Sequence, residues 1–357
     1  MNKHDHALLI GVNCYPKMDE NQWLNYAISD VERFQKWLLS PTGGNMDEGN
    51  ISTLCFPDEE ISHETPQPNV SDYRNKFGDY IDKAEYIHTL SPGDDEVADN
   101  DLYVDPDGKV YLGRRIYLYF SGHGFANVTN KDDNAMLTAD GDYYFRFGNH
   151  INGWKYSQYL EAMGVFKEIV LLMDCCRTVS RDLEINLSAP GRPLSDNHPR
   201  VIRTMRAYSS SHAKSSREDK KSKGGIFTTY LIKALENAPA TNDNNEITYE
   251  SFKAFFKNLT KDVKQGPTVS CGFDGEDIVL AVKESFNEVT LTFSDECIGK
   301  TLFIMNSSMQ KIEELTQEIQ GPNIALSLKT GFYGYVVKGT DITGGFDVSQ
   351  NIEQHVG

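Results

Sequence analysis

The stretches that decide the fold are Tyr117-Leu-Tyr-Phe-Ser-Gly-His-Gly124 and Ile169-Val-Leu-Leu-Met-Asp-Cys-Cys-Arg177. Each begins as a short apolar run of strand-forming residues and ends abruptly in polar, reactive side chains. In an open α/β sheet the carboxyl ends of parallel strands meet at one edge, where such proteins bind their ligands. The two stretches therefore predict buried strands that bring His123 and Cys176 to one crevice.

Similar apolar runs alternate with amphipathic helical segments along most of the chain. Helical spacing is clearest where Phe252, Phe255, Phe256 and Leu259 recur on one face. This alternation predicts an α/β fold in which helices cover both faces of a mostly parallel sheet. The predicted strands are residues 7–12, 51–55, 115–120, 168–173 and 201–208.

Near residue 285 the apolar pattern changes to a period of two. Val289, Leu291 and Phe293 alternate with polar residues, and the same alternation returns over residues 324–328. We therefore expect a peptide chain of two domains, an α/β domain over residues 1–285 and a small β-rich module over residues 286–357. Residues 307–319 are predicted to form one helix within the module.

Three segments interrupt the α/β rhythm. Residues 91–108 contain seven acids and no base, and their last four residues, Asp105-Pro-Asp-Gly108, are typical of a turn. We expect an acidic surface excursion that ends in a hairpin. Residues 177–200 and 211–225 are rich in turn-forming or polar residues and are predicted to be exposed loops.

The overall charge limits the kinds of partner. With 52 acidic and 35 basic residues, the chain has a formal charge of −17, which disfavours nucleic acid and anionic membrane surfaces and favours basic partners. The six cysteines have neither the density of a disulfide scaffold nor the spacing of a zinc site. No apolar run approaches the roughly 20 residues that span a bilayer, so we expect a cytoplasmic protein with reduced thiols.

The alternation of side chains along a strand selects the nucleophile. Ser121 and His123 should share one face, as should Asp174 and Cys176, while Cys175 points away. A nearby imidazole can take the proton of a thiol and stabilise the thiolate as an ion pair. The backbone N–H groups of Gly124 and Cys176 are expected to face the developing oxyanion.

Each motif taken alone has a plain structural alternative. A histidine at a strand end is about as often structural as catalytic, and a buried cysteine is usually packing. Two strand ends that carry complementary groups favour catalysis more strongly than either does alone.

The same residues resemble the caspase and metacaspase family of cysteine peptidases, in which a histidine precedes the catalytic cysteine by about 50 residues. The segments Ala7-Leu-Leu-Ile-Gly-Val-Asn-Cys-Tyr15 and Gly225-Ile-Phe-Thr-Thr-Tyr-Leu-Ile-Lys-Ala-Leu235 are also similar to family segments. The resemblance covers about residues 5–282. It implies a caspase-like three-layer sandwich and a thiol endopeptidase in which Cys176 is the nucleophile and His123 is the base.

The resemblance also implies a substrate class. Caspases cut after aspartate with arginines in the specificity pocket, whereas metacaspases cut after arginine or lysine with acids. Asp30, Ser121 and Asp174 match the metacaspase pocket residues, so we expect cleavage after arginine, with lysine second. The alternative for Asp30 is an ordinary carboxylate in the first turn of a helix.

The chain departs from the metacaspase pattern directly after the nucleophile. Arg177-Thr-Val stands where those enzymes usually have His-Ser-Gly. Metacaspases often need calcium, but the acids that follow the histidine motif do not have the spacing of an EF-hand, and we predict no metal or other cofactor. These acids are Asp132, Asp133, Asp140 and Asp142.

Residues 177–225 hold eleven Lys or Arg against five acids. By position they resemble the intersubunit linker of the family, so Arg181, Arg192 and Arg200 are candidate processing sites for the protein itself or an upstream protease. The alternative is a solvated loop. Bacterial relatives often act in programmed death or antiviral defence. Two rival functions are a noncatalytic caspase-like module for peptide binding or signalling, and an enzyme that acts on another acyl or ester substrate.

Overall fold

The computed structural model describes residues 2–56, 66–82, 84–127, 132–142, 149–178, 200–239, 245–272, 278–282, 286–306, 309–329, 331–348 and 352–356. The chain forms two compact units, Met1–Val282 and Lys283–Gly357. No helix within the described ranges has both the length and the apolar composition needed to cross a bilayer.

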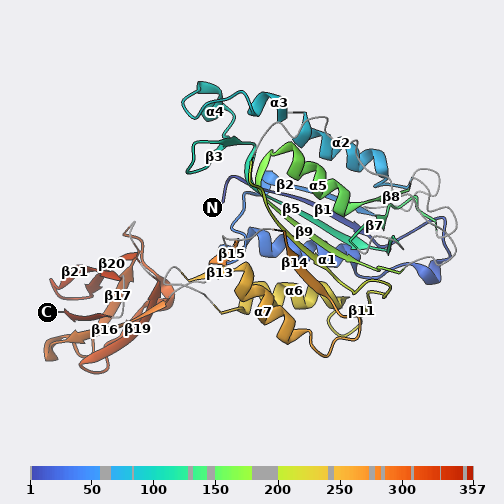
Figure 1. The fold of residues 1–357 in the computed structure, drawn as a ribbon. Helices are drawn as coiled ribbons and strands as arrows, with labels where there is room; N and C mark the ends of the chain where they lie inside the picture. Colours follow the sequence, from blue (N-terminus) through green and yellow to red (C-terminus); the bar gives the residue numbers. More distant parts are fainter. Residues whose placement is uncertain are drawn as a thin grey trace. The chain divides into compact units, whose positions relative to one another are not determined.

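The first unit is built on a six-stranded sheet with the order β14-β10-β9-β5-β1-β2 (Figure 1). All neighbouring strands are parallel except β14, which runs antiparallel to β10. The predicted mostly parallel sheet is therefore confirmed, with one antiparallel edge strand. The strands are β1 (Asp5–Val12), β2 (Ile51–Phe56), β5 (Gly113–Gly122), β9 (Phe166–Cys175), β10 (Arg203–Tyr208) and β14 (Thr268–Cys271).

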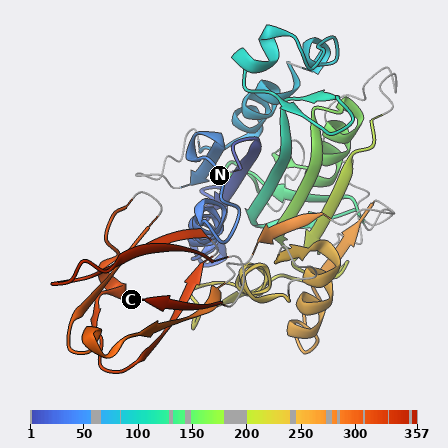
Figure 2. The ribbon, with the colours of Figure 1, turned by 90° about the vertical axis from the view of Figure 1, so that its left-hand side faces the viewer.

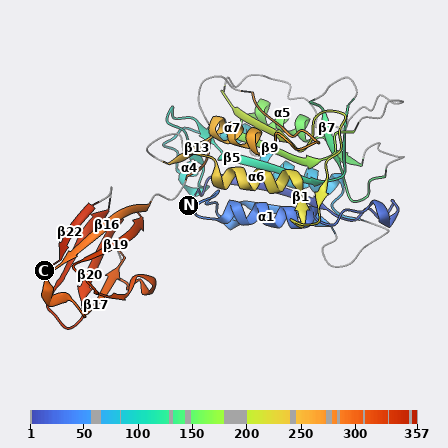
Figure 3. The same cartoon turned by 90° about the horizontal axis from the view of Figure 1, so that it is seen from below.

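Helices cover both faces of this sheet, as the near-continuous apolar strands require. On β5, Tyr117 and Tyr119 join a core with α1, α6 and α7, whereas Leu118 and Phe120 join a second core with α2 and α5. Figure 3 shows α1 and α6 side by side on the first of these faces. The helices are α1 (Ala27–Leu39), α2 (Val70–Ile81), α5 (Gly153–Met163), α6 (Ile226–Asn237) and α7 (Tyr249–Leu259).

Short elements surround this sandwich. The acidic segment ends in the predicted hairpin, where the Asp105 carboxylate accepts the N–H groups of Asp107 and Lys109 at 3.0 and 2.9 Å. The remaining elements of the unit are α3 (Ala84–Ile87), α4 (Asp95–Asp99), β3 (Tyr103–Val104), β4 (Val110–Tyr111), β6 (Gly124–Ala126), β7 (Asn134–Leu137), β8 (His150–Ile151), β11 (Glu218–Asp219), β12 (Gly224–Gly225), β13 (Glu246–Thr248) and β15 (Val279–Val282).

The second unit consists of two small sheets around one core (Figure 2). Val289, Leu291 and Phe293 are buried in that core, which explains their alternation with polar residues. One sheet has the order β19-β16-β22 and the other β18-β17-β20-β21. Their strands are β16 (Phe286–Phe293), β17 (Thr301–Met305), β18 (Gln317–Glu318), β19 (Asn323–Lys329), β20 (Gly331–Val337), β21 (Thr343–Val348) and β22 (Ile352–Val356).

The predicted helix over residues 307–319 is wrong. The described part of this segment contains one 3-10 turn, Glu313–Leu315, and the short strand β18, which pairs with β17. Met309 has a φ of 59°, which interrupts a right-handed helix. Pairing with an available strand has outweighed the helical spacing of the apolar residues.

Candidate active site

The two decisive strands lie side by side and end at the same level. In the parallel pair of β5 with β9, Ser121 is opposite Asp174 and Gly122 is opposite Cys175. His123 and Cys176 follow directly, and both line one cavity of about 120 Å³ at this edge of the sheet. The imidazole of His123 and the thiol of Cys176 therefore lie at one crevice.

Side-chain alternation separates the two neighbouring cysteines. Cys175 is 1% exposed and belongs to the core under α2 and α5. Cys176 is only partly buried and lines the cavity together with Ser121 and Asp174. Of the two cysteines, Cys176 is therefore the one that lines the cavity.

The His123 ring contacts Tyr15 and Gln22, two residues that follow β1 along the chain. Its ring centroid lies 4.7 Å from that of Tyr15, and its backbone N–H donates to the Tyr15 hydroxyl at 2.7 Å. Nε2 lies 2.6 Å from the carbonyl oxygen of Gln22. A carbonyl oxygen can only accept, so the neutral ring carries its proton on Nε2 and keeps Nδ1 as the basic nitrogen.

The Cys176 thiol is held by Ser216. The Ser216 N–H donates to Sγ at 3.2 Å, and Sγ lies 3.7 Å from the Ser216 carbonyl oxygen, toward which the thiol hydrogen can point. Burial raises the pKa of Cys176, with the Ser216 N–H opposing and the Asp174 charge adding to the rise. Burial lowers the pKa of His123. Burial therefore favours the uncharged form of both groups, and the ion pair expected from the sequence stays a prediction.

Gly124 serves the packing beneath the site. A Cβ at this position would lie 2.7 Å from Cβ of Cys175 and 2.8 Å from the carbonyl oxygen of Ala135. The absent side chain thus lets β6 lie against the end of β9. The oxyanion role of the Gly124 and Cys176 N–H groups stays a prediction.

Asp30 reaches the cavity from the first turn of α1 and is 1% exposed. The Gly225 N–H donates to both carboxylate oxygens at 3.0 and 2.8 Å, and the Ser121 hydroxyl lies 3.4 Å from Oδ2. Burial raises the pKa of Asp30 to about 8, and the neighbouring charge of Asp174 adds to this rise. An ordinary helix-end carboxylate would be exposed to solvent, so this position favours the pocket interpretation.

Asp174 forms the second acidic wall of the same cavity. It accepts hydrogen bonds from the Ser216 hydroxyl at 2.9 Å and from the hydroxyl and N–H of Thr228 at 2.7 and 3.2 Å. Burial raises its pKa as well. Gly225 lies between the acids, since a Cβ there would be 2.2 Å from Asp174 Oδ2 and 2.8 Å from Asp30 Oδ2.

Comparison with known proteins bears on this arrangement of thiol, imidazole and acids. Residues 113–276 match the family model described as the caspase domain. This chain contains a caspase domain. The match includes His123 and Cys176, whereas Asp30 precedes it, and the domain has the fold of a cysteine peptidase.

Two solved structures are similar to the chain at low identity. Caspase-1 from Spodoptera frugiperda is 14% identical with a TM-score of 0.44, and the alignment covers 80% of this chain and 92% of that one. A protein from Geobacter sulfurreducens is 13% identical with a TM-score of 0.44, over 78% of this chain and 97% of that one. No curated protein matches the chain.

The cavity is also lined by a residue that the sequence did not indicate as part of the site. Glu218 lines the cavity, and its carboxylate accepts the N–H groups of Asn25 and Tyr26 at 3.0 and 2.8 Å. Residues 211–225, predicted to be an exposed loop, instead carry the β11–β12 hairpin and one wall of the site. The only sequence signal was an acid within a Ser- and Lys-rich stretch, which is equally typical of solvated loops.

Arg177, where the caspase domain departs from the metacaspase pattern, lies in the protein interior. Its Nε donates to Asn134 at 2.8 Å, its Nη1 donates to the carbonyl of Ser210 at 3.1 Å, and the guanidinium lies 4.6 Å from the Tyr208 ring centroid. The residue after the nucleophile therefore ties the end of β9 to β7 and β10.

Two of the four acids after the histidine motif are engaged by neighbouring side chains. Asp133 accepts from Asn152 and pairs with Lys155 at 3.6 Å, and Asp140 accepts from the Thr138 hydroxyl at 2.6 Å. Within the described ranges no three His, Cys, Asp or Glu side chains are grouped so as to hold a metal ion.

The candidate processing sites differ in their position. Arg181 and Arg192 lie outside the described residues. Arg200 is half-buried, donates to the carbonyls of Val110 and Gly164 at 2.6 and 3.2 Å, and lies 4.6 Å from the Tyr111 ring centroid. Cleavage after Arg200 would require this side chain to leave its contacts.

Proposed function

We propose that the caspase domain is a cysteine endopeptidase that cleaves after arginine, with lysine as the second choice. The observation that carries this proposal is the single cavity in which Cys176 and His123 stand beside Asp30, Asp174 and Ser121. Two carboxylates can take the paired N–H donors of a guanidinium, whereas an ammonium offers a single charged point. An aspartate side chain would bring a third carboxyl group into this buried acidic site and would be disfavoured there.

In the proposed reaction Nδ1 of His123 takes the thiol proton while Cys176 Sγ attacks the carbonyl carbon of the scissile bond. The tetrahedral intermediate collapses as the C–N bond breaks, and the imidazolium returns the proton to the leaving amine. Water, deprotonated by His123, then hydrolyses the thioester. The N–H groups of Gly124 and Cys176 are proposed to donate to the oxyanion.

A panel of fluorogenic peptides that differ only at the residue before the scissile bond tests this proposal. We expect arginine to be cleaved fastest, lysine next, and alanine and aspartate far more slowly, with no cleavage by Cys176→Ala. The panel is run with and without a chelator, because the calcium requirement is part of the test. Equal rates for arginine and aspartate peptides would contradict the acidic pocket. Binding of basic peptides without cleavage would favour the noncatalytic module.

We also propose that cleavage within residues 177–225 activates the enzyme, by its own action or by an upstream protease. The excess of basic residues there supports this idea, because the proposed specificity would recognise them. Mass spectrometry of incubated wild-type and Cys176→Ala protein, with and without candidate proteases, measures the cuts. Intact chains under all conditions would contradict it. A role in bacterial defence rests on the family resemblance alone.

A further inference from the structure

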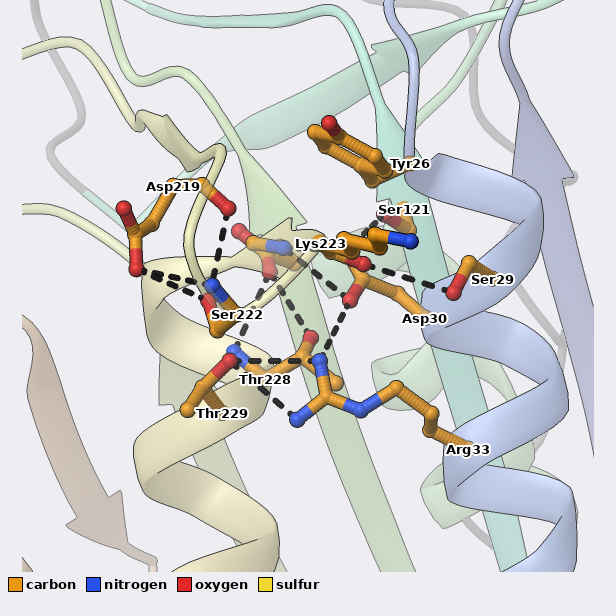
Figure 4. A network of polar contacts seen from close by, with 12 residues as sticks. Tyr26, Ser29, Asp30, Arg33, Ser121, Asp219, Ser222, Lys223, Thr228 and Thr229 are labelled. Carbon is orange, nitrogen blue, oxygen red and sulfur yellow. Dashed lines mark hydrogen bonds and ion pairs between the residues drawn. The ribbon is translucent and has the colours of Figure 1, made fainter.

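Arg33 lies one helical turn after Asp30 on α1 and pairs with it. Its Nη1 is 3.3 Å from Asp30 Oδ1, and both Nη groups donate to the Thr229 hydroxyl at 3.2 Å. Thr229 belongs to α6 and follows Thr228, which holds Asp174. Figure 4 shows the Arg33 side chain extending from α1 toward Thr229, with Asp30 beside it.

The two oxygens of Asp30 have different neighbours. Oδ2 faces the hydroxyl of Ser121, a cavity residue, whereas Oδ1 faces Arg33, which does not line the cavity. A Cβ at Gly224 would lie 2.1 Å from Arg33 Nη1 and 2.7 Å from Asp30 Oδ1. The backbone of β12 therefore packs directly over the ion pair and confines it behind the cavity wall.

The charges around Asp30 are unequal. Asp174 on β9 and Glu218 on β11 both oppose its ionisation, and Arg33 is the cation that favours it. Within the described residues, the one basic side chain paired with Asp30 is Arg33. Its guanidinium also repels an incoming cation, but the Asp30 carboxylate separates it from the cavity. The net effect of Arg33 on a cationic ligand is therefore favourable.

We propose that Arg33 is a positioning residue for specificity, which orients the Asp30 carboxyl group and favours its ionisation when a cation binds, and so sets the preference of the pocket for a cationic substrate side chain. The inference rests on the proposed function of the cavity. It assigns the role to a residue that touches the substrate only through Asp30.

The test compares Arg33→Gln, Arg33→Lys and the matched control Lys36→Gln, which removes a charge from an exposed position on the same helix. For an arginine peptide, Arg33→Gln should raise KM about tenfold and change kcat less than about twofold, because Asp30 without its neighbouring cation gives up its proton less readily when the substrate cation binds. The pH at which kcat/KM reaches half its maximum should also move upward. Arg33→Lys should recover most of both effects, and Lys36→Gln should behave as wild type.

An unchanged KM and pH profile in Arg33→Gln would overturn the inference, as would equal damage by Arg33→Lys together with a lower melting temperature. A second measurement separates this inference from the proposed function. Calorimetric titration of argininamide into Cys176→Ala, with and without Arg33→Gln, reports cation binding without catalysis. Arg33-dependent binding to a protein that cleaves no peptide would retain the inference and reject the peptidase. Cleavage after arginine, together with argininamide binding that does not depend on Arg33, would retain the proposed peptidase and reject the inference about Arg33.

Discussion

Buried acids lie at both the amino end and the carboxyl end of the β5–β9 pair, but their pKa values are shifted in opposite directions. At the amino end Glu168 is 2% exposed and is paired with Arg115 and Arg203. Burial alone would raise the pKa of Glu168, yet the two guanidiniums hold it below its usual value. At the carboxyl end the pKa values of Asp30 and Asp174 are raised, chiefly by burial.

The difference shows that one sheet can hold two kinds of charge cluster. One cluster is neutralised within the protein, and the other faces a cavity. The acid at the amino end has its cations within the protein, so its ion pairs are complete without any ligand. At the carboxyl end, the described part of the chain provides one ion pair, between Asp30 and Arg33, and both Asp30 and Asp174 face a cavity. Under the proposed function, the cation of the substrate side chain would supply the remaining positive charge. Four experiments can break or sharpen this contrast.

The largest expected effect is that of Cys176→Ala at the carboxyl end. Cleavage of an arginine peptide should fall on the order of 10⁴-fold or more, because the nucleophile is lost. The free energy of unfolding should change little, since Sγ contacts mainly Ser216. Steady-state kinetics and thermal melting measure the two quantities. Residual activity close to wild type would remove Cys176 from its proposed role.

At the amino end the effect should be on stability. Glu168→Gln leaves the buried Arg115 without its full countercharge and should lower the free energy of unfolding by about 3–5 kcal/mol. The kcat/KM of the folded fraction should stay near the wild-type value. Urea denaturation measures the loss, with the half-exposed Glu161, paired to Arg206, changed to Gln as the control. The contrast fails if Glu168→Gln lowers activity without lowering stability.

Asp174→Asn should show the opposite pattern. We expect kcat/KM for arginine peptides to fall about 10²–10³-fold, because a buried partner of the substrate cation is removed. The free energy of unfolding should stay the same or rise, since a desolvated acid is lost. An alanine peptide serves as the internal control. An equal loss for both peptides would show that Asp174 does not select the cation.

The smallest effect concerns stability as a function of pH. The pKa of Asp30 is about 8 in the folded chain against an ordinary 3.8, so between these values the folded state keeps a proton that the unfolded chain loses. The free energy of unfolding should therefore fall as the pH rises through this window, by at most about 1.4 kcal/mol per pH unit. Asp30→Asn should flatten the curve, as measured by urea denaturation from pH 5 to 8. An unchanged slope would contradict the raised pKa.

The fold and half of the site could be predicted from the sequence because their signals are local. An apolar run that ends in a reactive residue predicts both a strand and the edge of the sheet where the strand ends. This pattern was sufficient to predict that His123 and Cys176 lie at the same edge. The five predicted strands are present, each with one or both ends shifted by one or two residues. The failed helix over residues 307–319 shows the limit, since helical spacing does not report a strand that is available for pairing.

The acidic half of the site depends on contacts between distant parts of the chain. Asp30 could be predicted as a site residue only from the family resemblance, because the residues around it are typical of the first turn of any helix. Ser216 lies 40 residues after Cys176 along the chain, and Glu218 lies in the hairpin that follows Ser216. Arg33 meets Thr229 across 196 positions. No short-range pattern encodes such meetings, so only three-dimensional structure reveals them.

The span that matches the caspase domain begins at residue 113, after β1, β2 and α1. A recombinant fragment trimmed to that span would retain the sulfur and the imidazole. It would lack two of the six strands of the sheet, the Tyr15 and Gln22 support of the imidazole, and the cavity residue Asp30. Such a truncation would expose the flank of β5 that β1 covers and could not discriminate among peptides as the intact unit is proposed to do. A recombinant form that tests the proposed specificity should therefore begin upstream of β1.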